Sequence, residues 1–229
     1  MFNPKIIFII MIVLVLIPAC YAENNETDVV GDVDNDIIYF DASSEIDGDG
    51  TADNPYNTLT ASRIVDDSTI CLANGEYEID SSKTITSNVI IGCDPENTVI
   101  KYSQTLFTVN GNLVLKNLTI KNASISNRNT LTCENVIFMD SSSYTGGALS
   151  TLNRGNVHLT NCTFYNNSAN YGGAIYAYSS VVYINNCSFF NNSASALGGA
   201  VCDLDSTFVV NNSRANNNKA LHGGSIYKI

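Results

Sequence analysis

Residues 161–177 read NCTFYNNSANYGGAIYA and residues 186–202 read NCSFFNNSASALGGAVC, so the chain carries nearly the same string twice in succession. The Gly-Gly doublet that both strings contain occurs four times, beginning at Gly146, Gly172, Gly198 and Gly223. Successive doublets are 26, 26 and 25 residues apart. Self-similarity at a fixed period of about 20–50 residues is typical of repeat architectures, in which one structural unit stacks on the next.

Aligning the copies places equivalent residues in columns. One column holds asparagine in five copies: Asn117, Asn135, Asn161, Asn186 and Asn212. On both sides of this column, positions two apart are mainly apolar; around Asn161 they are Val157, Leu159, Cys162 and Phe164. A spacing of two is the period of a β-strand, in which alternate side chains share one face.

Each copy is expected to contain three short strands, which in the clearest copy are residues 174–177, 181–184 and 187–189. No copy shows a helical pattern of ten or more residues. Three short strands per repeat of about 18–26 residues describe one coil of a parallel β-helix. The sequence therefore predicts an all-β solenoid whose apolar columns face the interior.

The asparagine column is expected at a sharp corner between two strands. Asparagine tolerates the left-handed backbone region better than any residue except glycine, and stacked amides can hydrogen-bond along a column. The Gly-Gly column is expected to mark either a corner with positive φ or a close approach of two backbones.

The repeats resemble two groups of known proteins. Residues 164–167 (FYNN) followed by residues 172–175 (GGAI) are similar to the repeat of chlamydial polymorphic outer membrane proteins, and residues 189–192 with 198–201 match nearly as well. The same repeats look like those of adhesin-like surface proteins of methanogenic archaea. The resemblance covers about residues 130–229 and implies an extracellular or cell-surface, right-handed parallel β-helix. It implies no particular activity.

The first residues are interpreted as a targeting signal rather than as part of the fold. Residues 1–22 contain Lys5, an apolar run over residues 6–17 and small residues before position 22, which together predict a secretory signal peptide. The twelve apolar residues are fewer than the roughly 20 that span a bilayer. A retained membrane anchor and a lipoprotein signal at Cys20 are the alternatives. Residues 23–36 are expected to be an acidic linker.

Residues 37–68 are expected to form an N-terminal cap, and residues 69–229 the coils. Within the cap, Leu59, Ile64 and Val65 form an apolar stripe that predicts one or two helical turns, with Asn57 or Thr58 as the N-cap. The string DGDGTADNPY at residues 47–56 resembles the N-terminal cap of secreted β-helix proteins. That resemblance implies a capping role without chemistry.

A calcium site is the alternative interpretation of the same string. Asp47, Asp49, Thr51 and Asp53 stand at every second position, as oxygen ligands do in a calcium loop. Ala52 stands where an EF-hand loop requires glycine, and Thr58 stands where it requires a bidentate glutamate. A solvated turn is therefore the favoured interpretation.

Six cysteines follow the signal: Cys71, Cys93, Cys133, Cys162, Cys187 and Cys202. An even count in a secreted chain is compatible with a disulfide framework. Most of these cysteines lie in short apolar runs, however, where a thiol behaves as a small hydrophobic group. We therefore expect Cys162 and Cys187 to be buried thiols stacked on adjacent coils. The absence of a C-x-x-C motif disfavours zinc.

Groups that could perform catalysis are sparse in the repeats. A glycoside hydrolase needs two carboxylates about 5–10 Å apart, and after Asn97 the acidic residues are Glu134, Asp140, Asp203 and Asp205. We therefore expect no catalytic, cofactor-binding or metal-binding residues and a protein that is not an enzyme. The alternative is a carbohydrate-active β-helix enzyme, either a polysaccharide lyase or a glycoside hydrolase.

Charge and sequons indicate the partners. The formal net charge is −11, which disfavours a nucleic-acid partner. Eight N-x-S/T sequons predict a glycoprotein: Asn25, Asn117, Asn122, Asn161, Asn166, Asn186, Asn191 and Asn211. Asn166 and Asn191 are expected to be exposed loop residues and the better acceptors, whereas the corner asparagines are expected to be shielded.

The predicted function is that of an extracellular or cell-surface adhesin-like protein, structural or binding a cell-surface glycan or protein through its exposed faces. The sequence stops just after the fourth Gly-Gly doublet, where a new coil would begin. The expectation is that the 229-residue chain is a fragment of a longer surface protein and self-associates through an open last coil.

Overall fold

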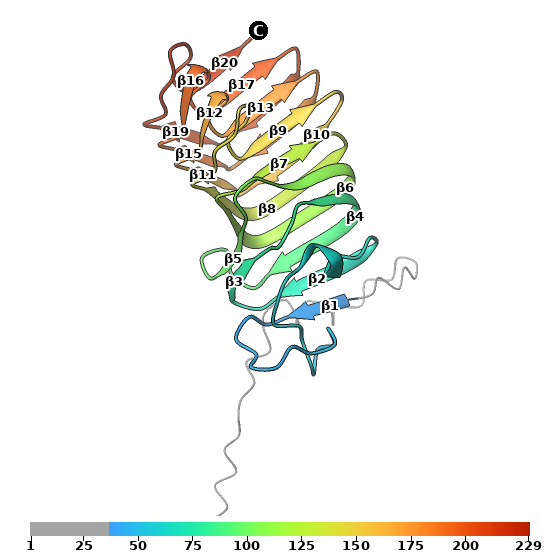
Figure 1. Ribbon diagram of the computed structural model, residues 1–229. Helices are drawn as coiled ribbons and strands as arrows, with labels where there is room; N and C mark the ends of the chain where they lie inside the picture. The colour runs from blue at the N-terminus through green and yellow to red at the C-terminus, as the bar shows by residue number, and fades with distance from the viewer. Residues whose placement is uncertain (1–36) are drawn as a thin grey trace, which may run out of the picture.

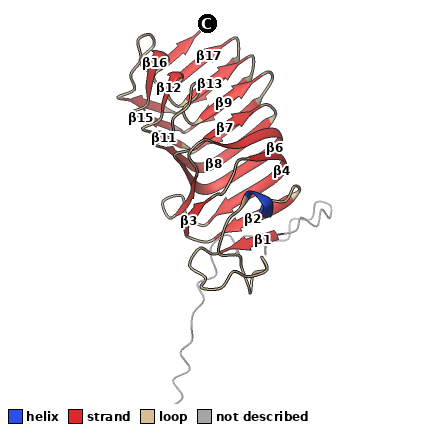
Figure 2. Ribbon diagram, viewed as in Figure 1, coloured by secondary structure: helices blue, strands red, loops and turns tan. Residues whose placement is uncertain are grey.

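The structure, a computed structural model, describes residues 37–229 (Figure 1). The signal peptide expected over residues 1–22 and the linker expected over residues 23–36 lie outside the described residues. The described chain is all-β, with one short helical turn (Figure 2). Its strands pair in parallel with strands from the preceding and following repeats, so that the sheet curls around a common interior.

Three ladders of parallel strands build the molecule, and one passage of the chain through them is here termed a coil. The first ladder runs through β1 (Ile37–Phe40), β2 (Ser68–Leu72), β4 (Lys83–Gly92), β6 (Thr105–Lys121), β8 (Thr130–Met139), β10 (Asn156–Thr160), β14 (Val181–Asn185) and β18 (Thr207–Asn211). Each of these strands pairs in parallel with the next one named.

The second ladder begins with β3 (Gly75–Glu78) and β5 (Thr98–Lys101), passes through the later parts of β6 and β8, and continues through β11 (Thr163–Tyr165), β15 (Ser188–Phe190) and β19 (Arg214–Asn216). The third runs from the early parts of β4 and β6 through β7 (Ser124–Asn127), β9 (Leu149–Leu152), β13 (Ile175–Tyr178), β17 (Val201–Leu204) and β20 (Ile226–Lys228). The chain visits the ladders in the same order in successive repeats, as the columns predicted.

A fourth side is present in the later coils only. There, β12 (Ser168–Tyr171) and β16 (Ser193–Leu197) form a separate two-stranded parallel sheet. Ser168 and Ala169 pair with residues 25 positions later, whereas Tyr171 pairs with Leu197, so an extra residue is taken up within β16. This irregularity converts a spacing of 25 at the asparagine corner into a spacing of 26 at the Gly-Gly doublets.

The interior is formed by like side chains stacked on like side chains. Phe138, Phe164 and Phe189 are buried, and their rings stack with centroids 4.8 Å apart at both steps and interplanar angles of 8° and 4°. That distance equals the separation of neighbouring strands, which is about 4.8 Å. The strand alternation read from the sequence therefore places the apolar columns inside, as predicted.

The corners follow the predicted backbone chemistry. All five members of the asparagine column have positive φ, between 50° and 55°. A second column with φ between 55° and 58° lies five residues further on and contains Asn122, Asp140, Asn166, Asn191 and Asn217. The first glycine of each doublet also has positive φ. The second is needed for close approach, because a Cβ at Gly173 would lie 2.1 Å from the carbonyl oxygen of Gly199.

The helical turns expected over residues 58–65 are largely absent. Only Ala61–Arg63 is helical, as the 3-10 turn η2. The N-cap predicted at Asn57 or Thr58 was wrong, because the turn begins after Thr60, whose side chain makes no capping bond. The carboxylate of Asp80 accepts the Ala61 amide hydrogen instead, at 2.8 Å. Leu59 and Ile64 are buried from non-helical backbone on either side of the turn, which gives a helix-like spacing without a helix.

Candidate functional site

A polar groove lies along the second corner column, on the outside of the later coils. It has a volume of about 530 Å³ and is lined by Asn166, Asn191, Asn192, Ser193, Asn217 and Lys219. The groove follows the edge between the β11–β15–β19 ladder and the β12–β16 sheet, so each repeat contributes an equivalent set of residues to it.

The left-handed backbone conformation of the asparagines at this corner directs their side chains outward. Asn166, Asn191 and Asn217 have φ of 55–56° and are exposed. The Nδ2 of Asn166 donates a hydrogen bond to Oδ1 of Asp140 in the preceding coil, at 2.8 Å. The expectation that Asn166 and Asn191 are exposed is confirmed, but they are conformationally restricted corner residues rather than loop residues.

The floor of the groove is an asparagine ladder that sequence reasoning missed. Asn167 and Asn192 are almost completely buried. The Nδ2 of Asn192 donates to Oδ1 of Asn218 at 3.0 Å and to the carbonyl oxygen of Phe164 at 3.0 Å. Its Oδ1 accepts from the backbone amide of Asn167 at 3.0 Å. The signal for this ladder was the second asparagine of the Asn-Asn doublet, which recurs at Asn167, Asn192 and Asn218.

Two outward-facing aromatic side chains are sequence neighbours of the groove asparagines. Tyr165 and Phe190 directly precede the corner asparagines and face outward, and Tyr165 is 41% exposed. The guanidinium carbon of Arg214 lies 5.2 Å from the centroid of the Phe190 ring, within the range of a cation–π contact. The groove itself combines asparagine amides, which donate and accept hydrogen bonds, with the cation of Lys219.

The first asparagine column does not behave as expected for shielded residues. Asn161 and Asn186 are exposed, although the Nδ2 of Asn186 donates to Oδ1 of Asn161 at 2.8 Å. A tight corner places its residue at the outermost point of the coil, so the side chain bonds along the column while remaining accessible. The same bond links Asn135 to Asn117 at 2.9 Å, which confirms that amides pair along this column.

The four carboxylates considered for catalysis are dispersed. Asp203 is buried inside the stack, where Oδ2 lies 3.0 Å from Nζ of Lys228, whereas Asp205 occupies an exposed corner with φ of 56°. Glu134 pairs with Lys116 at 3.4 Å on an outer face. Asp140 is the only one of the four that contacts a groove residue, through Asn166.

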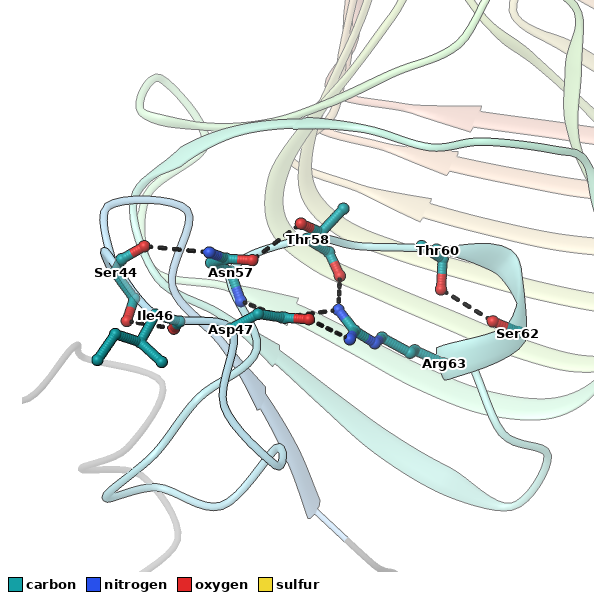
Figure 3. A network of polar contacts seen from close by, with 8 residues as sticks. All are labelled: Ser44, Ile46, Asp47, Asn57, Thr58, Thr60, Ser62 and Arg63. Atoms are coloured by element: carbon teal, nitrogen blue, oxygen red, sulfur yellow. Dashed lines mark hydrogen bonds and ion pairs between the residues drawn. The ribbon is translucent and has the colours of Figure 1, made fainter.

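Two carboxylates of the alternating acidic string, Asp47 and Asp49, make internal contacts, and those of Asp47 are drawn in Figure 3. The carboxylate of Asp47 receives two hydrogen bonds from the guanidinium group of Arg63, at 2.9 and 2.6 Å, and the Arg63 group also lies 3.9 Å from the centre of the Tyr56 ring. The hydrogen bond from Arg63 lowers the pKa of Asp47. Asp49 instead accepts from the amide and hydroxyl of Thr51.

Over residues 37–229, no three or more histidine, cysteine or acidic side chains gather in a way that could hold a metal ion. Within the same range, no helix has the length and apolar character needed to cross a bilayer.

Comparison with known proteins gives one match. The model of the Chlamydia polymorphic membrane protein repeat matches residues 161–178 and 186–203. These two segments each run from the asparagine corner through the groove to the strand after Gly-Gly, in consecutive coils. They make up less than a fifth of the chain. No curated protein and no solved structure matches the chain.

Proposed function

We propose that this chain is a cell-surface, adhesin-like right-handed parallel β-helix whose polar groove binds an extended glycan. The parallel ladders and the stacked interior columns support the solenoid. Two segments similar to the Chlamydia polymorphic membrane protein repeat support a surface location, since that repeat is named for a membrane protein. The resemblance to methanogen adhesin-like proteins remains a part of this proposal.

We choose an extended glycan as the ligand because the groove presents equivalent residues at a regular spacing. Asn166, Asn191 and Asn217 offer one amide per coil, at intervals of about 4.8 Å. Each amide group supplies two donors and one acceptor oxygen, which suits the hydroxyl groups of a sugar chain. Tyr165 and Phe190 directly precede two of these asparagines and face outward, so they add apolar surface next to the amides in the chain.

Binding of purified protein to an array of glycans tests the proposal. The sharpest variant is Asn191→Gly, because glycine retains the positive φ of the corner while it removes the amide. The matched control is Asn186→Gly, which makes the same change at the other corner of the same coil. We expect a loss of about tenfold in affinity for the first variant and less than about twofold for the control. Equal losses, or an array without any bound glycan, would exclude the groove as the binding site.

The same experiment addresses the enzyme alternative. If the chain were a polysaccharide lyase or a glycoside hydrolase, a bound polymer would shorten during incubation. We expect its length to stay constant, as measured by size-exclusion chromatography after incubation with the protein. Shortening would replace the adhesin proposal by the enzymatic one.

The second proposed interaction is between two copies of this chain. Around β18, β19 and β20, a small apolar pocket of about 70 Å³ is lined by Phe189, Phe208 and Ile226, among others, and Ile226 itself is about half exposed. We propose that a second copy stacks on this apolar surface. Sedimentation should show association that weakens when Ile226 is replaced by Asp, and a monomer at high concentration would rule it out.

A further inference from the structure

Cys162 and Cys187 occupy the same position in successive coils, each directly after a corner asparagine. Both side chains are 1% exposed, which confirms the predicted burial, and both thiols are free in this structure. The backbone amide of Cys162 donates to Sγ of Cys187 at 3.4 Å.

The surrounding backbone holds this pair in register. The amide of Ser188 donates to the carbonyl oxygen of Cys162 at 2.9 Å, and Thr163 pairs with Ser188 directly beyond the two cysteines. Neighbouring strands lie about 4.8 Å apart, which falls within the roughly 4.4–6.8 Å between Cα atoms that a disulfide spans. The ladder therefore holds the two residues at a backbone separation that a disulfide can span.

Two nearby cysteines do not share this arrangement. Cys133 pairs in register with Leu159, and Cys202 pairs with Tyr176 on one side and Tyr227 on the other. The carbonyl oxygen of Cys133 lies 3.5 Å from Sγ of Cys162, so Cys133 is near the pair but on the next interior column. Cysteine thus stands beside cysteine in one column at Cys162 and Cys187.

We propose that Cys162 and Cys187 are a site of oxidative modification, at which an interior disulfide joins two successive coils. Each thiol gives up its proton, and one Sγ–Sγ bond forms. The two electrons pass to a small disulfide such as oxidised glutathione, whose S–S bond breaks to give two thiols. Thiolates carry out this exchange, and their access to the oxidant controls its rate. Because both sulfurs are buried in the folded chain, the bond forms while the coils assemble.

The test is refolding of the full chain in a mixture of reduced and oxidised glutathione, followed by alkylation and mass spectrometry. The region between Arg154 and Arg214 contains no lysine or arginine, so trypsin leaves Cys162, Cys187 and Cys202 in one peptide. A protease that cuts after aromatic residues separates Cys162 from Cys187, for example at Tyr165 and Tyr183. We expect a cross-linked peptide pair that contains these two cysteines and disappears on reduction.

Two variants decide the assignment. Cys187→Ser should abolish the cross-link, and serine suits the site because Ser213 fills the equivalent position in the next coil, where its hydroxyl accepts the Cys187 amide at 2.9 Å. Cys133→Ser should leave the cross-link intact. The proposal is overturned if Cys162 and Cys187 are alkylated after refolding, or if either is linked to a different cysteine.

Discussion

The side-chain amide of Asn167 donates a hydrogen bond to Oδ1 of Asn192, 3.0 Å away in the next coil, and both side chains are almost completely buried. Oδ1 of Asn192 also accepts the backbone amide of Asn167, so one oxygen satisfies two donors. The interior of this all-β chain is therefore polar along one edge, and its polar groups are satisfied by the equivalent residue of the following coil.

Replacement of Asn192 by Ala should be among the most destabilising changes in the chain. It removes the side-chain acceptor of the buried Asn167 backbone amide, one of the two acceptors of the Asn167 side chain and one donor to the carbonyl oxygen of Phe164. An unpaired buried amide costs about 1–3 kcal/mol and each further lost hydrogen bond costs about 1 kcal/mol, so we expect a loss of about 3 kcal/mol in the free energy of unfolding. The urea midpoint measures this loss, and Asn191→Gly at the exposed neighbouring position is the control. Similar midpoints for the two variants would contradict a structural ladder.

The loss of stability on replacing a corner asparagine should depend on its left-handed backbone conformation rather than on how buried its side chain is. Asn161 and Asn166 have nearly the same φ, 55° and 56°, and each joins a side-chain bond along its column. We expect Asn161→Ala and Asn166→Ala to cost similar amounts, about 1–2 kcal/mol each, because alanine is strained in the left-handed region. Glycine at either position should cost less than alanine. Urea midpoints of the four variants check this order, and a markedly milder effect at Asn166 would show that its corner relaxes.

The Gly-Gly doublets offer a matched pair within one column. A Cβ at Gly173 would lie 2.1 Å from the carbonyl oxygen of Gly199, whereas a Cβ at Gly224 meets nothing closer than the carbonyl oxygen of Asn218 at 3.6 Å. Gly173→Ala should therefore cost about 3 kcal/mol or more, since backbone must move to admit the methyl group. Gly224→Ala should lie within about 0.5 kcal/mol of the parent chain. Thermal unfolding of both variants measures the difference, and equal melting temperatures would refute the close approach.

The ion pair of the cap makes a pH-dependent prediction. The hydrogen bond from Arg63 lowers the pKa of Asp47 below 3.8, the ordinary value for an aspartate. A carboxyl group whose pKa is lowered by folding contributes stability that is present above pH 3.8 and is lost as the pH falls through the folded-state pKa. Asp47→Asn should therefore lower the urea midpoint at pH 7 and have less effect at pH 2. Because the pair is exposed, the difference at pH 7 should be small and should shrink further in high salt. A pH-independent difference would mean that the carboxylate charge plays no part.

The strand pattern could be predicted from the sequence because stacked coils place equivalent residues in equivalent environments. Each repeat therefore shows the same alternation of interior apolar and exterior polar residues. Val157 and Val182 in one column and Phe164 and Phe189 in another are buried, so the chemistry of these columns is repeated. In the last copy, Phe208 is half-buried and Ala215 is exposed. The buried asparagine floor was missed for the opposite reason. Asn167 is polar and follows an exposed corner residue, and its burial is explained by hydrogen bonds to the coils on both sides, which the sequence does not display. The length of the helical turn at Ala61–Arg63 was overestimated because Leu59 and Ile64 reach the core from non-helical backbone on either side of it.

The groove was not predicted from the sequence, although its residues were visible there. Asn166 and Asn191 were identified as exposed, but the location of a groove depends on where β12 and β16 pair beside the second ladder. That small sheet forms through two corners in close succession, and alternation of apolar residues carries no information about corners.

The extra residue in β16 has a consequence for how such a chain can diversify. The three ladders that surround the interior pair each coil with its neighbours residue by residue. A change of length in one of their strands would therefore displace side chains in several coils at once. The β12–β16 sheet absorbs a residue without disturbing either the asparagine corner before it or the Gly-Gly doublet after it. This small sheet is therefore the part of the coil that tolerates a change in length. Insertions can accumulate in this wall, next to the groove, and reshape its rim from one repeat to another while the scaffold that supports it stays the same.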